Sequence, residues 1–486
     1  MSRAAHFQTL KSAPVFDLAV IGGGATGLGV ALDAALRGFS VVLLESHDFG
    51  GGTSSRSTKL LHGGVRYLAQ GNVALVREAL AERANVLRIA PHLAQPLPFV
   101  MPSYHWWQTP FYGLGLKLYD LMAGRAGLGR TEFLDKKQAL SALPGIQMQG
   151  LKGGVKYWDG QFDDARLALA IARTAEAAGA VVLNYVEVTG LRMAGAGPHP
   201  LDVSQIEVQD RLTGEAQTVS ARCVVNATGV WVDKLRNQAL NASNAAGATN
   251  AQMVSPSQGV HVVVDREFLP GDHALLVPKT RDGRVLFAVP WMGKLILGTT
   301  DTPRKDLPRE PDAFQEELDF ILNEAGHVLA SPVKVHDVRS IWVGLRPLVA
   351  PPQTDAGGTK TISREHTIVV DDNGLLTVTG GKWTTYRAMA EDVMDRVFEK
   401  TLLKKRPSPN TASHRLLGAP TTNAPLTPLC GPPGMHLYGT EQPSVAACPG
   451  HERQLGMGLT EAMVRFAVRS EYAQTVEDVL ARRWRA

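Results

Sequence analysis

The spacing of hydrophobic positions changes along this 486-residue chain and predicts different structures in different regions. Near its beginning, the short run Leu18–Ile21 is apolar at every position, which is typical of a strand buried on both faces of a parallel sheet. A glycine-rich turn follows, and apolar residues then recur at helical spacing as far as Gly38. The run Ser40–Leu44 predicts a second strand. The chain therefore begins with a predicted strand, helix and strand.

The turn between the first strand and the helix has the glycine spacing of a dinucleotide-binding site. Gly22 permits a sharp turn, Gly24 lets the backbone approach a pyrophosphate, and Gly27 lets the helix pack closely against the strand. The first amides of the helix would attract the anion. Glu45 ends the second strand, roughly 20 positions after the glycines, where a carboxylate binds ribose hydroxyls. The order of these elements predicts a bound dinucleotide.

A second segment rich in glycine and hydroxyl groups follows Glu45 and reads SHDFGGGTSSRSTKLLHGGVRY. Its hydroxyl groups are suited to capping a helix and contacting phosphate oxygens, and a lysine adds positive charge. The backbone at His62 and Gly64 is expected to approach a flat ring. The candidates with polar side chains are Thr53, Ser54, Thr58 and Lys59. A flexible surface loop is the alternative interpretation.

Two later segments add further strands. An alanine-rich helix is predicted after its N-cap, Asp163 or Asp164, and a strand begins at Val181. Val224–Ala227 predicts another buried strand, and Gly229 after it would let the backbone approach the cofactor. The second segment therefore repeats the strand-to-glycine arrangement at the beginning of the chain.

Between residues 257 and 301 the hydrophobic pattern changes to alternation, which predicts an antiparallel sheet. Asp282-Gly283 and Met292-Gly293 are hairpin signals within it. We expect this sheet to lie over the bound cofactor. His261 belongs to the first of its strands, where a lone histidine is more often a packed residue than a catalytic one.

The segment SYHWWQTPFYGLGLKLYDLMAG combines aromatic residues with an amphipathic run and few charges. This pattern is typical of a helix that lies at a bilayer surface. Packing in the core, or against a second copy of the chain in a dimer, explains the pattern equally well.

The composition is that of an ordinary soluble protein with two or three structural units. Its 50 Lys and Arg residues against 46 Asp and Glu give a net charge of +4, which predicts no nucleic-acid binding but is compatible with anionic lipids or metabolites. Three cysteines lack metal-ligand spacing, so we predict no metal site and a reducing compartment. Without an apolar leader or a run of 18 apolar residues, we expect a cytoplasmic protein or one peripheral on a membrane.

The stretch from Asp17 through TSSRSTKLLHGGVRYL resembles the beginning of the FAD-dependent glycerol-3-phosphate dehydrogenases, within the larger family that includes D-amino-acid oxidase. The match recurs along most of the chain. It implies an α/β fold with a Rossmann-type FAD-binding domain interleaved with an antiparallel-sheet substrate domain, plus a short helical C-terminal domain. The implied divisions are an oxidoreductase region at 14–400, with FAD-binding parts at about 14–105, 150–250 and 355–400 and a substrate-binding sheet at about 251–354, and a C-terminal domain at 401–486.

The resemblance also implies contacts with the cofactor. It places the backbone near Val186 against adenine, and it places the glycines and helix of the GGKWTT segment at the pyrimidine edge of the flavin. The ATG that contains Ala227 is similar to a second flavin-contact motif. The expected FAD-binding residues are Gly22, Gly24, Gly27, Glu45, Thr53, Ser54, Thr58, Lys59, Leu60, His62, Gly64, Val186, Ala227, Gly229, Gly381, Lys382 and Thr384.

Two residues are expected to carry the reaction. The motif SQGVHVVV resembles the family segment whose histidine faces the substrate, and GLRPL resembles the one whose arginine lies over the reacting carbon. Histidine is suited to act as a base near neutral pH, and arginine is suited to hold a developing alkoxide. We assign these roles to His261 and Arg346, and it stays open which of them is the base or whether they act as one unit.

A phosphorylated substrate needs several cations, because burying an uncompensated dianion would cost tens of kcal/mol. Arg66, Tyr67 and Lys382 flank the flavin segments and are the expected substrate-binding residues. The resemblance implies oxidation of sn-glycerol 3-phosphate to dihydroxyacetone phosphate by hydride transfer to FAD, with electrons passed to a membrane quinone. It also implies peripheral contact with an anionic membrane at the inner face of the cytoplasmic membrane, and a homodimer is left open.

Other functions fit the same fold. One alternative is an FAD-dependent oxidase that acts on a 2-hydroxy acid or amine and uses oxygen. Another is a flavin-binding sensor or scaffold without turnover. A nicotinamide enzyme is disfavoured because the chain shows no second nucleotide fingerprint.

Overall fold

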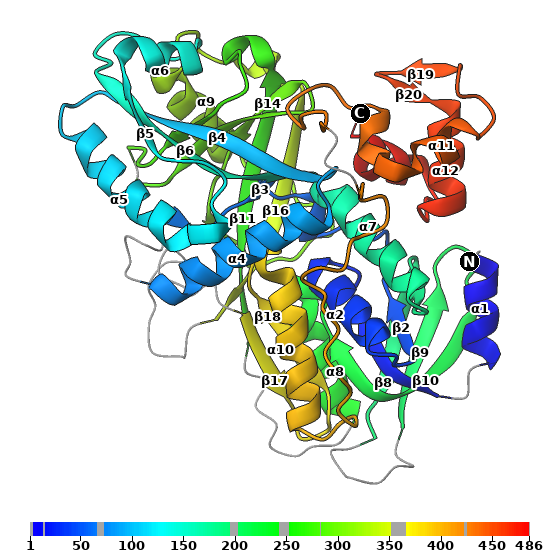
Figure 1. Ribbon diagram of the computed structural model, residues 1–486. Coiled ribbons are helices and arrows are strands. Elements are labelled where there is room, and N and C mark those ends of the chain that lie inside the picture. Colours follow the sequence, from blue (N-terminus) through cyan, green and yellow to red (C-terminus); the bar gives the residue numbers. More distant parts are fainter. Residues whose placement is uncertain are drawn as a thin grey trace.

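The computed structural model describes residues 3–12, 15–65, 72–194, 203–242, 252–281, 283–350, 366–421 and 425–485. These residues form two large sheets with their helices and a smaller unit built from the last part of the chain (Figure 1). The first sheet lies in the lower half of that view, the second sheet in the upper half, and the smaller unit, in orange and red, beside both.

The first sheet has a parallel centre with antiparallel additions at its edges. Its strands are β1 (Phe16–Ile21), β2 (Val41–Leu44), β7 (Val181–Leu183), β8 (Val186–Arg192), β9 (Ser204–Asp210), β10 (Ala216–Asn226), β17 (His366–Val370) and β18 (Leu376–Gly380). Strands β18, β10, β1, β2 and β7 are parallel neighbours in that order. This arrangement confirms the Rossmann-type half of the expected fold.

Helices cover both faces of the first sheet. On one face lie α2 (Ala25–Leu36), α7 (Asp164–Ala177) and α10 (Tyr386–Glu399), and on the other lie α1 (Arg3–Ser12) and α8 (Val232–Ala242). Along β1, Leu18 and Val20 pack into the first core, while Ala19 and Ile21 pack into the second. A strand between two layers of helix must be apolar at every position, which explains the unbroken hydrophobic run.

The second sheet is almost entirely antiparallel. Its strands are β3 (Leu60–Leu61), β4 (Ala94–Ser103), β5 (Glu132–Asp135), β6 (Gly153–Phe162), β11 (Val254–Asp265), β12 (Ala274–Val277), β13 (Leu286–Trp291), β14 (Lys294–Gly298), β15 (Thr302–Pro303) and β16 (Ser340–Val349). The turn between β13 and β14 is Met292-Gly293, with φ of +47° and +76°, so the hairpin predicted there is confirmed. Asp282, in the other predicted hairpin, lies outside the described residues.

The second sheet begins much earlier in the chain than the range of about 251–354 expected for it. Strand β4 pairs with β12 in parallel and with β6 over its whole length. Residues 94–103 and 153–162 therefore belong to this sheet, although the divisions implied by the resemblance placed them with the FAD-binding parts at about 14–105 and 150–250. The two sheets are interleaved more often along the chain than expected.

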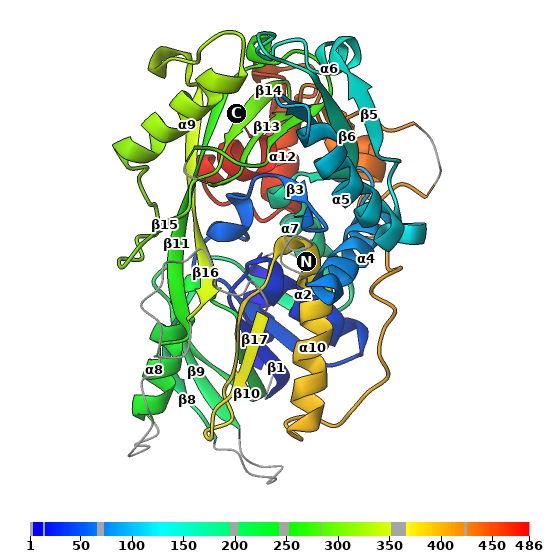
Figure 2. The same ribbon diagram turned by 90° about the vertical axis from the view of Figure 1, so that its left-hand side faces the viewer.

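Helices α9 (Gln315–Val328) and α6 (Lys136–Ala142) cover one face of the second sheet, and part of the other face is turned toward the first sheet. Helix α9 packs on alternate residues of β11, Val260 and Val262, and α6 joins the same core. His261 therefore points to the opposite face, toward the loops of the first sheet. Figure 2 shows β11 and β16 running down from the second sheet toward the first.

Two more helices lie beside the second sheet, and one of them packs through Leu116 on the face opposite α9 and α6. They are α4 (Val73–Ile89) and α5 (Gln108–Ala123), which pack against each other (Figure 2). Leu116 and Tyr119 are the buried residues that anchor α5, while several aromatic and aliphatic side chains on the rest of the helix are exposed.

The smaller unit contains the two helical segments expected near the end of the chain and a hairpin that was not expected. Its elements are α11 (Gln442–Ala446), β19 (Gln454–Gly456), β20 (Leu459–Thr460), α12 (Glu461–Ser470) and a π-helix (Asp478–Trp484). Tyr438 and Phe466 stack edge to face in its core. The helical C-terminal unit of the expected fold is thus confirmed.

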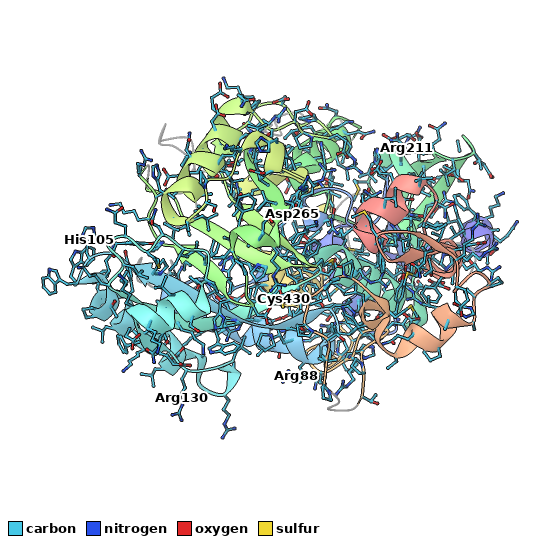
Figure 3. The ribbon with its side chains drawn as sticks, turned by 90° about the horizontal axis from the view of Figure 1, so that it is seen from above. Arg88, His105, Arg130, Arg211, Asp265 and Cys430 are labelled. Carbon is cyan, nitrogen blue, oxygen red and sulfur yellow. The ribbon has the colours of Figure 1, made fainter. Side chains whose placement is uncertain are left out.

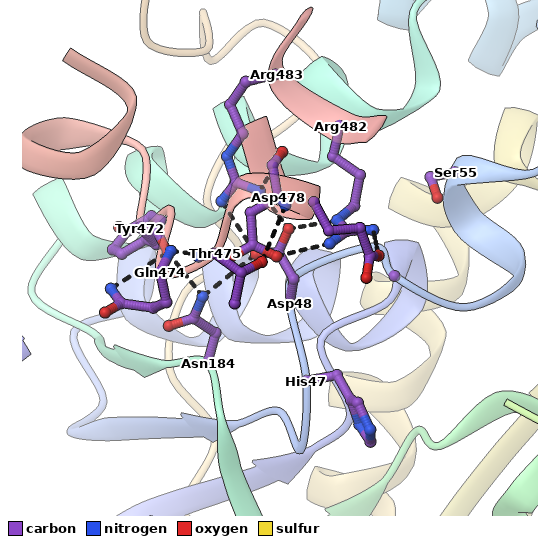
Figure 4. Close-up of polar contacts among 12 residues, drawn as sticks. His47, Asp48, Ser55, Asn184, Tyr472, Gln474, Thr475, Asp478, Arg482 and Arg483 are labelled. Carbon is purple, nitrogen blue, oxygen red and sulfur yellow. Dashed lines mark hydrogen bonds and ion pairs between the residues drawn. The ribbon is translucent and has the colours of Figure 1, made fainter. Parts of the chain in front are cut away.

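A buried network of charges joins this unit to the loop after β2 (Figure 4). The carboxylate of Asp48 accepts hydrogen bonds from Arg482 Nε at 2.5 Å and from Arg483. Arg482 also donates to Asp478 at 2.6 Å, and the hydroxyl of Tyr185 donates to the same carboxylate at 2.7 Å. We call Asp48, Asp478, Arg482 and Arg483 the Asp48 network. The Asp48 and Arg483 side chains are each only 1% exposed, so their charges depend on one another rather than on water.

Candidate active site

A cavity of about 300 Å³ lies where the carboxyl ends of β1, β2 and β10 meet. Its walls come from the glycine turn after β1, residues 45–54 after β2, the start of β8, and residues 227–231 after β10. In open α/β sheets, ligands bind in the crevice at this edge. The cavity is therefore the expected place for a dinucleotide.

The three glycines of the turn allow chain segments to approach closely. Gly22 has φ of +111°, and a Cβ atom there would lie 2.5 Å from the carbonyl oxygen of Ala227. A Cβ atom at Gly27 would lie 2.0 Å from the carbonyl oxygen of Gly22. The sharp turn and the close packing of α2 are as predicted, and Gly24 lines the cavity, where its contact with a pyrophosphate stays a prediction.

Glu45 is held at the cavity wall by several donors. Its Oε2 accepts a hydrogen bond from Gly23 N at 2.7 Å. Its Oε1 accepts from His47 N at 2.8 Å, Ser46 Oγ at 3.2 Å and Arg309 Nη2 at 3.0 Å. Burial alone would raise the pKa of Glu45, but the charge of Arg309 and the two amides outweigh burial and hold the pKa below its usual value. The carboxylate is therefore ionised near neutral pH.

The hydroxyl-rich segment 53–59 connects the cavity to the second sheet. The hydroxyl of Thr53, which lines the cavity, donates to a backbone carbonyl of β16. The indole of Trp342, also on β16, donates to the carbonyl oxygen of Ser57 at 3.3 Å. These contacts hold the segment against the second sheet, so the alternative of a flexible surface loop is not supported.

Ser54 joins this segment to the glycine turn and to the GGKWTT segment. Its Oγ accepts from Ala25 N at 3.0 Å, and its carbonyl oxygen accepts from the indole of Trp383 at 2.7 Å. Gly381 has φ of +71°, and a Cβ atom there would lie 2.4 Å from a methionine sulfur of α10. Lys382 and Thr384 flank Trp383, so they lie close to segment 53–59 in the fold.

His261 and Arg346 project from the same face of the antiparallel pair β11 and β16. In this pair, His261 lies opposite Trp342, and Ser257 lies opposite Arg346. Because side chains two positions apart share a face, all four residues point toward segment 53–59. The imidazole stacks on the indole of Trp342, with ring centroids 5.4 Å apart.

The imidazole of His261 is 2% exposed and has two distinct nitrogens. Its Nε2 lies 2.8 Å from Thr58 Oγ1, whereas its Nδ1 is buried without a hydrogen-bond partner among the described residues. Burial first, and then the positive charges of Arg346 and Lys59, hold the pKa of His261 well below 6.5. The ring is therefore neutral at physiological pH.

The guanidinium of Arg346 lies over the backbone of Gly259, where a Cβ atom would collide with it. It donates to the carbonyl oxygen of Gln258 at 3.2 Å and to Thr299 Oγ1 at 3.0 Å, and it lies 3.4 Å from Asp301. The side chain is 22% exposed, so solvent or a ligand still reaches it.

Lys59 is completely buried and its ammonium group contacts protein rather than the cavity. It donates to both oxygens of Asp164 at 2.8 and 2.9 Å and to Ser55 O at 2.8 Å, and it lies 4.7 Å from the ring of Trp342. Arg485 pairs with the same aspartate at 2.5 Å. Burial, and then the charge of Arg485, lower the pKa of Lys59 to about 7 against the opposing effect of Asp164. These contacts do not support the predicted role of its charge at a phosphate.

The remaining predicted residues fall into three groups. Val186, Ala227 and Gly229 line the cavity. Leu60 is a buried residue of β3, while His62 and Gly64 follow that strand. Arg66 and Tyr67 lie outside the described residues, so their expected contact with a phosphate stays a prediction.

Comparison with known proteins identifies the family. The model of the family described as FAD dependent oxidoreductase matches residues 17–387, which is well over half of the chain. The chain belongs to the FAD-dependent oxidoreductases.

Relatives within this oxidoreductase family include glycerol-3-phosphate dehydrogenases. The mitochondrial glycerol-3-phosphate dehydrogenase of Mus musculus is 46% identical over 84% of this chain and 56% of its own length. That of Macaca fascicularis is 42% identical over 100% of this chain and 69% of its own length. The X-ray structure of a glycerol-3-phosphate dehydrogenase from Bacillus halodurans complexed with FAD has a TM-score of 0.75 and 32% identity, covering 99% of this chain and 88% of that one. The chain thus spans little more than half of the mouse relative.

The residues around the cavity fit the FAD of this oxidoreductase family. The glycine turn leaves the backbone uncovered beside the first amides of α2, which are donors for a diphosphate. Glu45 is ionised and is placed to accept from ribose hydroxyls. The unpartnered Nδ1 of His261 is a buried polar atom on the sheet face that meets segment 53–59.

Several residues of this flavoprotein site were not recognised in the sequence. Arg309 lines the cavity, Trp342 contacts both His261 and Lys59, and Asp164 holds Lys59. Trp342 could have been recognised, because it precedes Arg346 by four positions in the same strand and therefore shares its face. No local pattern indicates Arg309, because it reaches the cavity from a distant loop.

Proposed function

We propose that this flavoprotein oxidises sn-glycerol 3-phosphate to dihydroxyacetone phosphate with FAD as the hydride acceptor and passes the electrons to a membrane quinone. The observation that carries the proposal is the position of His261 and Arg346 on one sheet face, directly over the segment that joins the FAD cavity to that sheet. The names of the relatives support the substrate.

His261 is the proposed base. When bound, FAD supplies a ring that accepts a hydride from the carbon bearing the substrate hydroxyl. The neutral imidazole accepts the hydroxyl proton at Nδ1, because Nε2 is held by Thr58. If Nε2 carries the hydrogen and donates it to Thr58 Oγ1, the lone pair is left on Nδ1, so Thr58 sets the tautomer.

Arg346 is proposed to stabilise the negative charge that develops on the substrate oxygen. Its contacts with Gln258 O and Thr299 Oγ1 fix the guanidinium before the substrate arrives. Its own charge also keeps His261 neutral, and thus ready to accept a proton. Lys382, with Arg66 and Tyr67, is proposed to bind the phosphate.

Thr58→Val is expected to lower kcat by at least about tenfold, since a general base contributes about 10²–10⁴-fold and its tautomer would no longer be set. The flavin absorbance of the purified variant verifies that FAD is still bound. Flavin reduction under single-turnover conditions measures the effect, and Thr58→Ser, which keeps the hydroxyl, is the matched control. Equal rates for the valine variant and the unmodified protein would show that Thr58 does not position the base.

The value of kcat/KM is expected to stay level as the pH falls from 8 to 6.5 and to decrease only below that. The pKa of His261 is held well below 6.5, so the base stays unprotonated until the pH falls through this lowered value. The phosphate of the substrate titrates in the same pH range and changes substrate binding. The inhibition constant of the mirror-image isomer, measured at each pH, is used to correct kcat/KM for this change in binding. Half-loss of corrected activity near pH 6.5 would contradict a buried neutral histidine.

Anaerobic addition of sn-glycerol 3-phosphate to the purified yellow protein tests the function as a whole. Loss of flavin absorbance, with one dihydroxyacetone phosphate formed per flavin, would support the proposal. Reduction by a 2-hydroxy acid or an amine, with peroxide formed in air, would favour the oxidase alternative. Flavin that stays oxidised with all of these compounds would favour a sensor or scaffold.

The exposed face of α5 is the proposed contact with the membrane, at the inner face of the cytoplasmic membrane. Among the residues that the structure describes, no helix is both long and apolar enough to cross a bilayer. Phe111 and Leu114 on α5 are 66% and 73% exposed, and Trp106, two residues before the helix, is 82% exposed, which together make a large apolar surface. His105 and Arg130 mark this outer part of the molecule in Figure 3, on the side away from Arg211.

Replacing Trp106, Phe111 and Leu114 together with serine is expected to weaken binding to phosphatidylglycerol vesicles by at least about tenfold, because aromatic side chains bury a large apolar area at an interface. Vesicle cosedimentation measures the binding. Replacing three other exposed residues with serine provides the control: Val335, Val468 and Val476. Unchanged vesicle binding together with the loss of a dimer in sedimentation would instead assign this face to a homodimer.

A further inference from the structure

Arg309 reaches the FAD cavity from the loop between β15 and α9, which belongs to the second sheet's part of the chain. Its guanidinium lies 3.0 Å from Glu45 Oε1 and 3.4 Å from Ser46 Oγ, and 4.8 Å from the ring centroid of Trp231. Arg309, Glu45 and Trp231 all line the cavity. The arginine therefore stands at the part of the carboxylate that faces a ligand.

The loop makes one contact on each side of Arg309. The indole of Trp231 donates to the carbonyl oxygen of Leu307 at 3.2 Å, and Arg56 pairs with Glu310 at 2.6 Å. These contacts attach the loop to the cavity wall and to segment 53–59. The side chain of Arg309 can thus change position while its loop stays attached.

Oε1 of Glu45 has both lone pairs occupied by His47 N and Arg309 Nη2, and the Ser46 hydroxyl, which also reaches His47 Nδ1 at 2.9 Å, crowds it further. A ribose diol bound by this acid needs room at both oxygens. The amide of His47 is fixed in the backbone and Ser46 is its neighbour. Arg309, with its long flexible side chain, is the donor that yields most easily.

A cation in this cavity would stabilise a diphosphate further, in addition to the amides at the start of α2. Glu45 and Glu187 line the cavity and add negative charge. Burial, and then Arg309 and Arg211, lower the pKa of His47 to about 4, so this histidine is neutral at physiological pH. Among the described lining residues the permanent cations are Lys234, which is exposed, and Arg309. Guanidinium binds phosphate oxygens with two parallel hydrogen bonds.

The geometry points to a change of partner by Arg309 when a dinucleotide binds. Its guanidinium leaves Oε1 of Glu45, which then accepts from a ribose hydroxyl, and pairs with the diphosphate of the same molecule. This change of partner favours ligands that carry a diphosphate over nucleosides without one. Only a diphosphate offers Arg309 a new ion pair in place of the one it loses with Glu45. Arg309 is therefore a determinant of selectivity for nucleotides. This role does not depend on which substrate the flavin oxidises.

Arg309→Ala is expected to change the binding of two ligands in opposite directions. Adenosine should bind about three- to fivefold more tightly, because its ribose no longer competes with a partly exposed ion pair. ADP should bind about tenfold more weakly, because a charge-assisted contact with the diphosphate is lost. Calorimetric titration of the full-length chain, after reversible removal of FAD, measures both, and recovery of flavin absorbance on adding FAD verifies that each variant is intact.

Two further variants separate the charge from the loop. Arg309→Lys keeps the charge and should bind ADP within about threefold of the unmodified protein. Arg304→Ala removes an arginine of the same loop that pairs with Asp306 and does not line the cavity, and it should leave both ligands unchanged. Changes in the same direction for adenosine and ADP, or no change in either, would overturn the proposal.

The intact holoenzyme provides a second measurement if FAD cannot be removed reversibly. In the unmodified protein, salt should accelerate the release of FAD, because it screens the pairing of Arg309 with the diphosphate. The acceleration should be clearly smaller in the Arg309→Ala variant. An equal salt dependence in both proteins would also overturn the proposal.

Discussion

Arg346→Ala is expected to slow the reduction of the flavin by sn-glycerol 3-phosphate by about 10²–10³-fold, the usual effect of removing one donor that stabilises a developing oxyanion. The guanidinium is held by Gln258 O and Thr299 Oγ1 on the sheet face it shares with His261, and it lies outside the cavity that Glu45 lines. The protein should therefore stay yellow. Anaerobic stopped-flow absorbance measures the rate of bleaching.

Arg339→Ala is the matched control, because Arg339 immediately precedes β16 and pairs with Asp265 at the surface. It should bleach at the rate of the unmodified protein. Arg346→Lys keeps the charge but loses the planar fork, so an intermediate rate is expected. A normal rate of bleaching in the Arg346→Ala variant would show that Arg346 does not take part in the reaction. Loss of FAD from this variant would indicate a structural role instead.

Asp48→Ala is expected to lower the free energy of unfolding by about 3–5 kcal/mol, the usual cost of leaving a buried charge without its partner, because Arg483 loses its carboxylate while Arg482 keeps Asp478. Arg482 and Arg483 both donate to this carboxylate, and the Arg483 side chain is 1% exposed. The change would leave two guanidinium groups facing a cavity where the carboxylate was (Figure 4). Urea denaturation at saturating FAD measures the difference, and limited proteolysis near residue 425 reports whether the C-terminal unit detaches.

Asp265→Ala provides the comparison, because Asp265 also accepts from two cations, Lys294 and Arg339, but at the surface. It is labelled near the centre of Figure 3. Surface ion pairs contribute about 0–1 kcal/mol, so its effect should stay below about 1 kcal/mol. Equal losses in the two variants would show that burial does not make the Asp48 network more important than an ordinary ion pair.

The parts of the fold that depend on neighbouring residues were predictable from the sequence. The turn at Gly22, the packing at Gly27 and the hairpin at Met292-Gly293 each follow from backbone geometry within a few residues. Asp163 is the N-cap of α7, one of the two caps predicted, since its carboxylate accepts from two amides of the first turn. Such features need no knowledge of distant segments.

The parts that depend on distant segments were not predictable in this way. β4 looks like any apolar strand, and only its pairing with β6 and β12 places it in the second sheet. The same holds for Arg309, which meets Glu45 across 264 positions of the chain. Charge pairing at such separations leaves no periodic pattern, so resemblance indicated the family residues but not these contacts.

The interleaving of the two sheets has a consequence for biosynthesis. β1 leaves the ribosome early, but its neighbour β10 follows about 200 residues later and β18 about 160 residues after that. β2 pairs with one edge of β1 almost at once, but at roughly 5–20 residues per second the other edge waits on the order of tens of seconds for β10. During this delay an apolar edge is exposed to other chains, which makes co-translational protection by chaperones important for the yield of this protein.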